Sequence, residues 1–123
     1  MGDLTAAIAL YQTLREDLAP PALEILHAQV REHFDNLVRA QQRHELVAID
    51  LAELLCLGLE GLLAAAGAFT SDARANVVGA ARYFISANDA VPDDRSCTGL
   101  DDDVEVFNHV AVSLGRSDLK IVG

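Results

Sequence analysis

A chain of 123 residues with 51% hydrophobic and 23% charged residues suits one folded domain and is too apolar for a disordered protein. Its formal net charge of −10 repels nucleic-acid phosphates and anionic membrane surfaces, which argues against direct binding to either. Aromatic residues make up only 5% and Trp is absent. Ala and Leu dominate instead, and both lose little entropy in a helix, so we expect an all-α protein.

The first predicted helix runs from about residue 5 to residue 17, and the second from about residue 21 to residue 42. In the first, one apolar stripe at three- and four-residue spacing contains Leu4, Ile8, Tyr11, Leu14 and Leu18. The sequence "APP" at residues 19–21 ends it and opens the next, because proline is tolerated in a first turn. One face of the second helix contains Leu23, Leu26, Val30, Phe34, Leu37 and Val38, and its charged residues lie mostly elsewhere.

The third predicted helix, from about residue 45 to residue 66, is the most apolar. Between Leu51 and Phe69 its only charges are Glu53 and Glu60, seven residues apart on one narrow stripe. Two acids argue against a membrane span, which needs about 20 predominantly apolar residues. We therefore expect a central helix with neighbours on most sides, or one whose surplus apolar face meets another subunit. Gly58 and Gly61 would allow a close approach of another helix.

The fourth predicted helix starts at Thr70 or Ser71 and runs to about residue 86, with Val77, Val78, Ala81, Phe84 and Ile85 facing the core. The fifth starts after Asp102 or Asp103 and ends at Gly115, with Val106, Phe107, Val110, Ala111 and Leu114 facing inward. Residues 116–123 form a loosely docked strap. The expected architecture is a compact bundle of about five helices in a single domain, residues 1–123.

The two cysteines do not suggest a disulfide framework, which usually has more pairs in a secreted domain. Cys56 lies in the apolar run "LLCLGLEGLL" and Cys97 in an acidic segment, so we expect two free thiols in a reducing compartment. Asp3 stands where a signal peptide has its basic residues. The sequence therefore predicts a cytoplasmic protein.

Seven of the nineteen residues from Asn88 to Val106 are acidic. We expect a loop here, in which Asp and Asn side chains form turns and cap the next helix. An alternative is a Ca²⁺ or Mg²⁺ site that uses Asp89, Asp93, Asp102 or Asp103, because a divalent ion relieves repulsion between crowded carboxylates. A calcium-loop template laid on residues 94–105 matches only loosely, since hydroxyl residues stand at two strong ligand positions.

The stretch "ARYFISANDAVPDDRSCTGLDDDVEV" resembles the YkvA-like family, a bacterial domain of unknown function. The resemblance covers about residues 73–114 and is carried by Tyr83, Phe84, Asp89, Pro92, Asp93, Gly99, Asp102 and Asp103. Asp101 departs from the family, many members of which have an apolar residue before the acidic pair. The resemblance implies a small all-helical bacterial domain, and it implies no activity.

The four histidines do not indicate catalysis. Glu24 and His27 form one Glu-x-x-His, half of a di-iron motif, and no second copy is present. We expect solvated side chains at His33 and His44, and a hydrogen bond from His109 to acids of the preceding loop. There is no G-x-S-x-G elbow and no P-loop, and acidic neighbours make Cys97 a poor nucleophile.

These observations favour a small, soluble, non-enzymatic interaction module that binds a protein partner. Surplus apolar surface on the third helix would be buried in an isologous homodimer. Two alternatives stay open: a divalent-cation-binding domain, and an acidic decoy that inhibits a basic nucleic-acid-binding protein.

Overall fold

The computed structural model describes residues 3–42, 49–90 and 96–121, and the side chains of residues 7–40, 49–85 and 103–121. It has five α-helices and two short 3-10 helices in these ranges: α1 (Asp3–Leu14), α2 (Pro20–Gln42), α3 (Ile49–Ala65), η1 (Ala66–Ala68), α4 (Ser71–Ala90), α5 (Ser96–Ser113) and η3 (Ser117–Leu119). None of the described residues forms a strand. The expected all-α bundle is thus confirmed.

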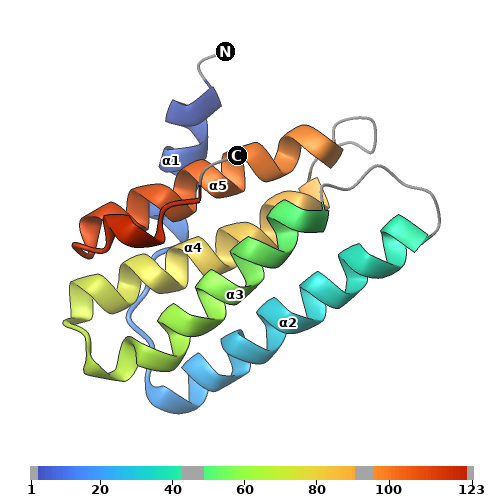
Figure 1. Ribbon diagram of the computed structural model, residues 1–123. Coiled ribbons are helices and arrows are strands. Elements are labelled where there is room, and N and C mark those ends of the chain that lie inside the picture. Colours follow the sequence, from blue (N-terminus) through green and yellow to red (C-terminus); the bar gives the residue numbers. More distant parts are fainter. Residues whose placement is uncertain (1–2, 43–48, 91–95, 122–123) are drawn as a thin grey trace.

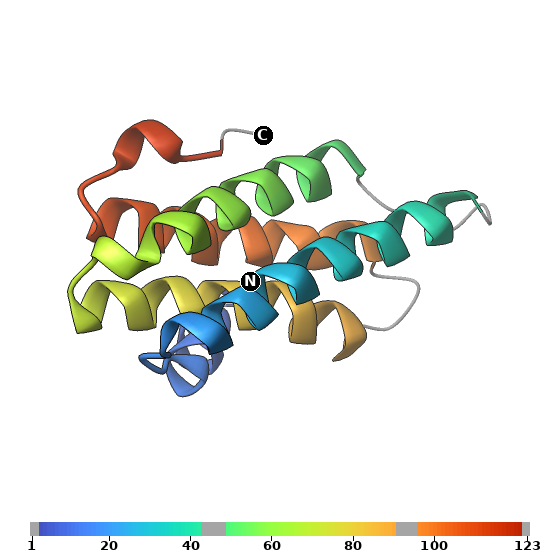
Figure 2. The ribbon, with the colours of Figure 1, turned by 90° about the horizontal axis from the view of Figure 1, so that it is seen from below.

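Helices α2, α3, α4 and α5 run along a common direction, and α1 crosses behind them (Figure 1). The main packed pairs are α2 with α3, α4 with α5, and α1 with α4. Figure 2 shows α3 and the C-terminal residues on one side of α5, with α1 on the other. Helix α4 contacts all four other α-helices, whereas the main contacts of α3 are with α2, α4, α5 and η1.

The core is formed by the apolar faces that the periodicity predicts. Helix α3 contributes Ala52, Leu55, Cys56, Leu59, Leu62 and Leu63. The other large side chains with less than 2% exposure include Tyr11, Val30, Phe84, Val106 and Val110. Removing so much apolar surface from water is the main stabilising contribution to the fold.

Two glycines allow close helix packing, and one predicted for that role does not. A Cβ at Gly58 would lie 2.6 Å from Cζ of Phe107, so the bare backbone of α3 admits this ring of α5. A Cβ at Gly79 would lie 2.8 Å from Cε1 of Tyr11, which brings α1 onto α4 in the same way. A Cβ at Gly61 would meet no atom within 4 Å. Gly61 therefore faces open space on α3.

The segment expected as an acidic loop is largely helical. Helix α4 continues to Ala90, past the predicted end at residue 86, and α5 begins at Ser96 instead of after Asp102 or Asp103. Asp, Asn and Gly favour turns, but each costs at most about 1 kcal/mol in a helix. Burial of Val104, Val106 and Phe107 in the same helix outweighs that local preference.

Helix α1 ends at Leu14, three residues before its predicted end. Two arginines of α4 hold the link that follows. Arg82 donates to the carbonyl oxygen of Leu14 and pairs with Glu16, and Arg74 pairs with Asp17 through an Nε–Oδ1 contact of 2.6 Å. The acids that periodicity assigned to the helix therefore anchor a connection across the bundle.

The C-terminal strap is docked by specific hydrogen bonds. Gly115 has a φ of 74°, and the amide of Arg116 donates to the carbonyl oxygen of Ala111 at 2.8 Å, which is the glycine-ended helix stop that the sequence predicts. The side-chain amide of Asn108 accepts from the Ile121 amide at 2.7 Å and donates to the Ile121 carbonyl oxygen at 3.0 Å. Ile121 is 9% exposed, so the strap adds to the core.

Candidate functional site

The residues predicted for a cation site fall on different parts of the structure. Asp89 lies in the last turn of α4, Gly99 and Asp102 lie in α5, and Pro92 and Asp93 lie outside the described residues. Asp103, also in α5, is only 3% exposed. The calcium-loop template is wrong, because its positions from residue 96 to residue 105 are helical and a helix cannot wrap around an ion as that loop does.

Metal-ligating residues do not cluster elsewhere in the part of the chain that is described. No group of three His, Cys, Asp or Glu side chains there could hold a metal ion. The looser Ca²⁺ or Mg²⁺ site depends on Asp89, Asp93 and Asp102, whose side chains are outside that part, so it stays a prediction.

The histidines differ in their surroundings. His33, expected in solvent, is 8% exposed, and its ring meets that of Phe84 edge-on at 4.9 Å between centroids. Its position continues the face of Leu26 and Val30 at three- and four-residue spacing, a signal that was present in the sequence. His109 is exposed, with its ring 5.6 Å from that of Tyr11. His44 lies outside the described residues.

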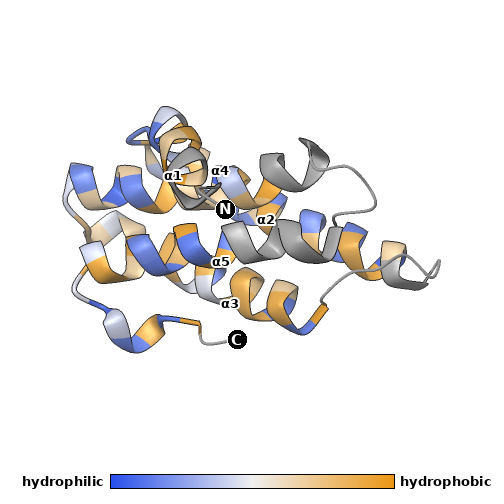
Figure 3. Cartoon of the chain, turned by 90° about the horizontal axis from the view of Figure 1, so that it is seen from above, coloured by the Kyte–Doolittle hydropathy of each residue, from blue (hydrophilic) through white to orange (hydrophobic). Residues whose placement is uncertain are grey.

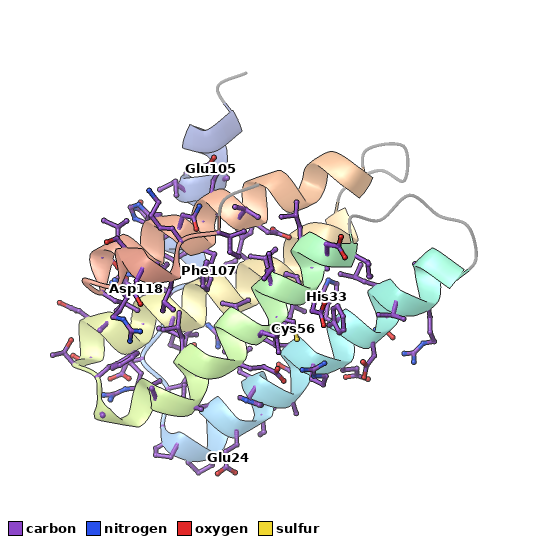
Figure 4. The ribbon with its side chains drawn as sticks, viewed as in Figure 1. Glu24, His33, Cys56, Glu105, Phe107 and Asp118 are labelled. Atoms are coloured by element: carbon purple, nitrogen blue, oxygen red, sulfur yellow. The ribbon has the colours of Figure 1, made fainter. Side chains whose placement is uncertain are left out.

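A polar cluster joins α2 to α3. Arg31 donates from Nη2 to Oε1 of Glu60 at 2.6 Å and from Nε to Oε2 at 3.1 Å. The guanidinium carbon of Arg31 also lies 5.5 Å from the ring centroid of Phe34. Figure 4 labels Cys56 and His33, which lie on these two facing helices. The Arg31 hydrogen bonds lower the pKa of Glu60, and the pair aligns the two helices.

Acid should weaken this cluster. The lowered pKa of Glu60 means that its carboxylate stabilises the fold above the ordinary value of 4.5, and that this contribution is lost as pH falls through the folded-state pKa. Glu60 is 16% and Arg31 43% exposed, so water screens the pair. We expect the ion pair to contribute roughly 1 kcal/mol to the free energy of unfolding. Urea unfolding from pH 7 to pH 3 should show the difference between the wild type and Glu60→Gln shrinking below pH 4.5.

Glu105→Gln, on an exposed position of α5, controls for the change in net charge. A stability difference between wild type and Glu60→Gln that is the same at pH 7 and pH 3 would contradict a role for the ionised carboxylate.

The thiol of Cys56 is chemically protected. Its side chain is fully buried, and burial together with the nearby Glu60 carboxylate raises its pKa to about 12. A thiol reacts through its thiolate, so Cys56 should resist modification at pH 8 in the native protein. Cys56 is a free cysteine, as expected, and its raised pKa makes it unsuitable as a nucleophile.

Thiol titration with a chromogenic disulfide reagent should show this protection. In a Cys97→Ser background, the native protein should release almost no chromophore, and the urea-unfolded protein should release one equivalent. Rapid release from the native variant would mean that α3 is loosely packed around Cys56. The raised pKa also predicts that stability falls as pH rises above about 9, the ordinary thiol value.

Helix α3 exposes an apolar stripe. Leu54 is 48% and Leu57 53% exposed. Gly61 and Ala64 of α3 and Ala68 of η1 continue the line and are also exposed. These five positions, spaced by three and four residues, are called the outer stripe below. Figure 3 shows that the visible part of α3 is rich in apolar residues.

A groove lies beside the second half of the outer stripe. Its volume is about 390 Å³, and it is lined by Pro20, Leu23, Glu24, His27, Leu63, Ala64 and Gly67. Most of this lining is apolar, and Glu24 and His27 on the α2 wall are its only ionisable groups. Figure 4 shows Glu24 near the start of α2. The groove suits an apolar side chain better than a reacting substrate.

The same helix is long and apolar enough to cross a membrane by length and composition alone. The segment Ile49–Ala68 has a mean hydropathy of 1.7, and 39% of it is buried inside the structure. A core helix of a soluble protein has the same properties. Its inner side packs on three helices, and Glu60 is held by Arg31. The expected absence of a membrane span stays a prediction.

Comparison with known proteins identifies no relative of this chain. The chain matches no protein-family model, no curated protein and no solved structure. The resemblance of residues 73–114 to the YkvA-like family therefore remains a prediction from the motif.

Proposed function

We propose that this chain is a non-enzymatic protein-interaction module that docks through the outer stripe of α3. The observation that carries the proposal is the half-exposure of Leu54 and Leu57 on a helix whose other side forms the core. Two adjacent leucines beside a row of small residues offer a contiguous apolar surface, and such surfaces on soluble domains mark contact sites.

The surroundings of the outer stripe support a protein partner over a small reactant. Two hollows of about 290 and 390 Å³ are lined mainly by apolar residues, and a third of about 420 Å³ also contains the paired side chains of Asp17 and Arg74. Cys56 is buried, and its raised pKa makes its thiol less reactive. A chemical reaction needs converging polar groups, and apolar docking needs a dry, accessible face, which α3 supplies.

Site-specific photo-crosslinking tests this function. A photoreactive amino acid at Leu57, introduced in cells that express the protein, should give one discrete protein adduct. The control is the same amino acid at Ile25, a 62% exposed position on α2 outside the outer stripe. We expect the adduct at position 57 to be at least several-fold stronger than at position 25. Equal labelling at both positions, or no adduct at either, would overturn the proposal.

A further inference from the structure

The two halves of the outer stripe differ in side-chain size. Its first half has the bulky residues Leu54 and Leu57, and its second half has Ala64 and Ala68. Gly61 lies between them, and a Cβ added at Gly61 would meet no atom within 4 Å. Seven residues separate Leu57 from Ala64, and fourteen separate Leu54 from Ala68. Seven positions are close to two helical turns, so Leu57 and Ala64 lie nearly on one line along α3, and Ala68 lies in η1, directly after the end of α3.

The groove beside the second half of the outer stripe lies on the same side of α3 as Leu57. The 390 Å³ groove is lined on the α3 side by Leu63, Ala64 and Gly67, and on the α2 side by Leu23. Leu57 lies on the same side of α3 as Ala64, two turns away. One end of this surface therefore carries a projecting leucine, and the other end a hollow with leucine walls.

Such a surface is complementary to itself under one symmetry operation. A two-fold axis that passes in front of Gly61, between the two copies and perpendicular to α3, makes the two helices antiparallel. Leu57 of one copy then faces Ala64 and the groove of the other, and Leu54 faces Ala68. A parallel arrangement would instead place the leucines of both copies at the same level and leave both grooves empty. An isologous contact requires this kind of self-complementary patch.

The charges on α3 favour the same arrangement. Asp50 and Glu53 are exposed near its first turns, and no charged residue lies from Gly61 to Phe69. Antiparallel pairing places the acids of each copy beside the uncharged end of α3 in the other, where Glu24 of the groove is the nearby acid, and parallel pairing would bring the four α3 carboxylates together. In a chain with a net charge of −10, that repulsion would be a strong penalty. Antiparallel helix dipoles also attract each other.

We propose that the occupant of the outer stripe is a second copy of this chain, paired antiparallel about Gly61. This inference rests on the proposed function and names its partner. The face of a 20-residue helix is roughly 30 Å long and 10 Å wide, or roughly 300 Å². A standard interface buries about 800 Å² per partner, so the walls of the groove must contribute and the dimer should dissociate at micromolar concentration.

Sedimentation equilibrium of the purified full chain measures the association. We expect a monomer–dimer equilibrium with a dissociation constant that rises at least about tenfold in Leu57→Gln and Gly61→Gln. The Gly61 variant is the sharper test, because its side chain meets no atom of its own copy and glutamine favours a helix over glycine. Its melting temperature at low concentration should be equal to or above that of the wild type.

Ile25→Gln is the matched control, because it removes an exposed aliphatic side chain from α2 outside the outer stripe. Its dissociation constant should equal that of the wild type. Equal weakening by Ile25→Gln, or a wild type that stays monomeric at 200 μM, would overturn the self-pairing.

Disulfide trapping distinguishes the two orientations. Leu54→Cys and Ala68→Cys are made separately in a Cys97→Ser background and carry tags of different size. Mild oxidation of the mixture should give mainly the mixed dimer, because a disulfide needs Cα atoms within about 7 Å. Each variant alone should cross-link weakly. Strong cross-linking of Leu54→Cys with itself would overturn the antiparallel arrangement.

The two proposals fail in different ways. A photo-adduct at Leu57 with a different polypeptide, together with a monomeric purified chain, would overturn the self-pairing and keep the interaction function. A missing adduct together with a monomeric chain would overturn both.

Discussion

Gly58→Ala should destabilise the protein by about 1–3 kcal/mol, although alanine is the better helix former. The added Cβ would lie 2.6 Å from Cζ and 2.9 Å from Cε1 of Phe107. That ring is 2% exposed and fixed between α3 and α5, so it cannot move aside without displacing other core residues. Overpacking of this kind forces backbone shifts. Urea unfolding followed by circular dichroism measures the change.

Gly61→Ala is the matched control in the same helix. Its Cβ would meet nothing within 4 Å, so the change keeps only the helix-propensity gain, about 1 kcal/mol. The two substitutions, one turn apart, should therefore change stability in opposite directions at protein concentrations where the chain is monomeric. Destabilisation of similar size at both positions would mean that the backbone of α3 matters more than the contact with Phe107.

Phe84→Ala should cost about 3–5 kcal/mol, the range for removal of a buried aromatic side chain. Phe84 is 1% exposed, belongs to the core of α4, and meets the ring of His33 at 4.9 Å between centroids. The substitution leaves a cavity between α2 and α4 and removes the aromatic contact of a buried histidine. The total free energy of unfolding of a domain of this size is about 5–15 kcal/mol. The variant should therefore be close to unfolding at 37 °C.

Phe34→Ala is the control, because Phe34 is partly buried at the edge of the core and lies near the Arg31 guanidinium. We expect Phe34→Ala to lower the free energy of unfolding by less than half as much as Phe84→Ala. Thermal and urea unfolding of both variants measure the difference. Equal losses would show that the core extends across the outer side of α2.

The acidic segment and His33 show how a prediction made from neighbouring residues can be wrong. The acidic segment was expected to be a loop because Asn, Asp and Gly are common in turns. Helix α5 nevertheless begins at Ser96. Val104, Val106 and Phe107 pack into the core, and their burial stabilises the helix that contains the acidic residues. His33 was assigned to solvent from its charged neighbours in sequence, although it lies on the line of Leu26 and Val30.

The all-α class, the number of helices and the apolar faces that contain Leu23, Leu26, Val30, Phe84 and Phe107 follow from the residues alone. These properties depend on residue propensity and on spacing within one helix, so they can be read locally. The sequence also indicated that α3 has more apolar surface than a single bundle needs.

Which side of α3 is covered depends on how the helices pack together. Gly58 and Gly61 look alike in the sequence, yet one receives the ring of Phe107 and the other faces open space. Leu55 and Leu57 are equally apolar, yet one is fully buried and the other 53% exposed. The difference arises because the partner of each face comes from a segment distant in the chain, and the packing of those segments is a property of the whole fold.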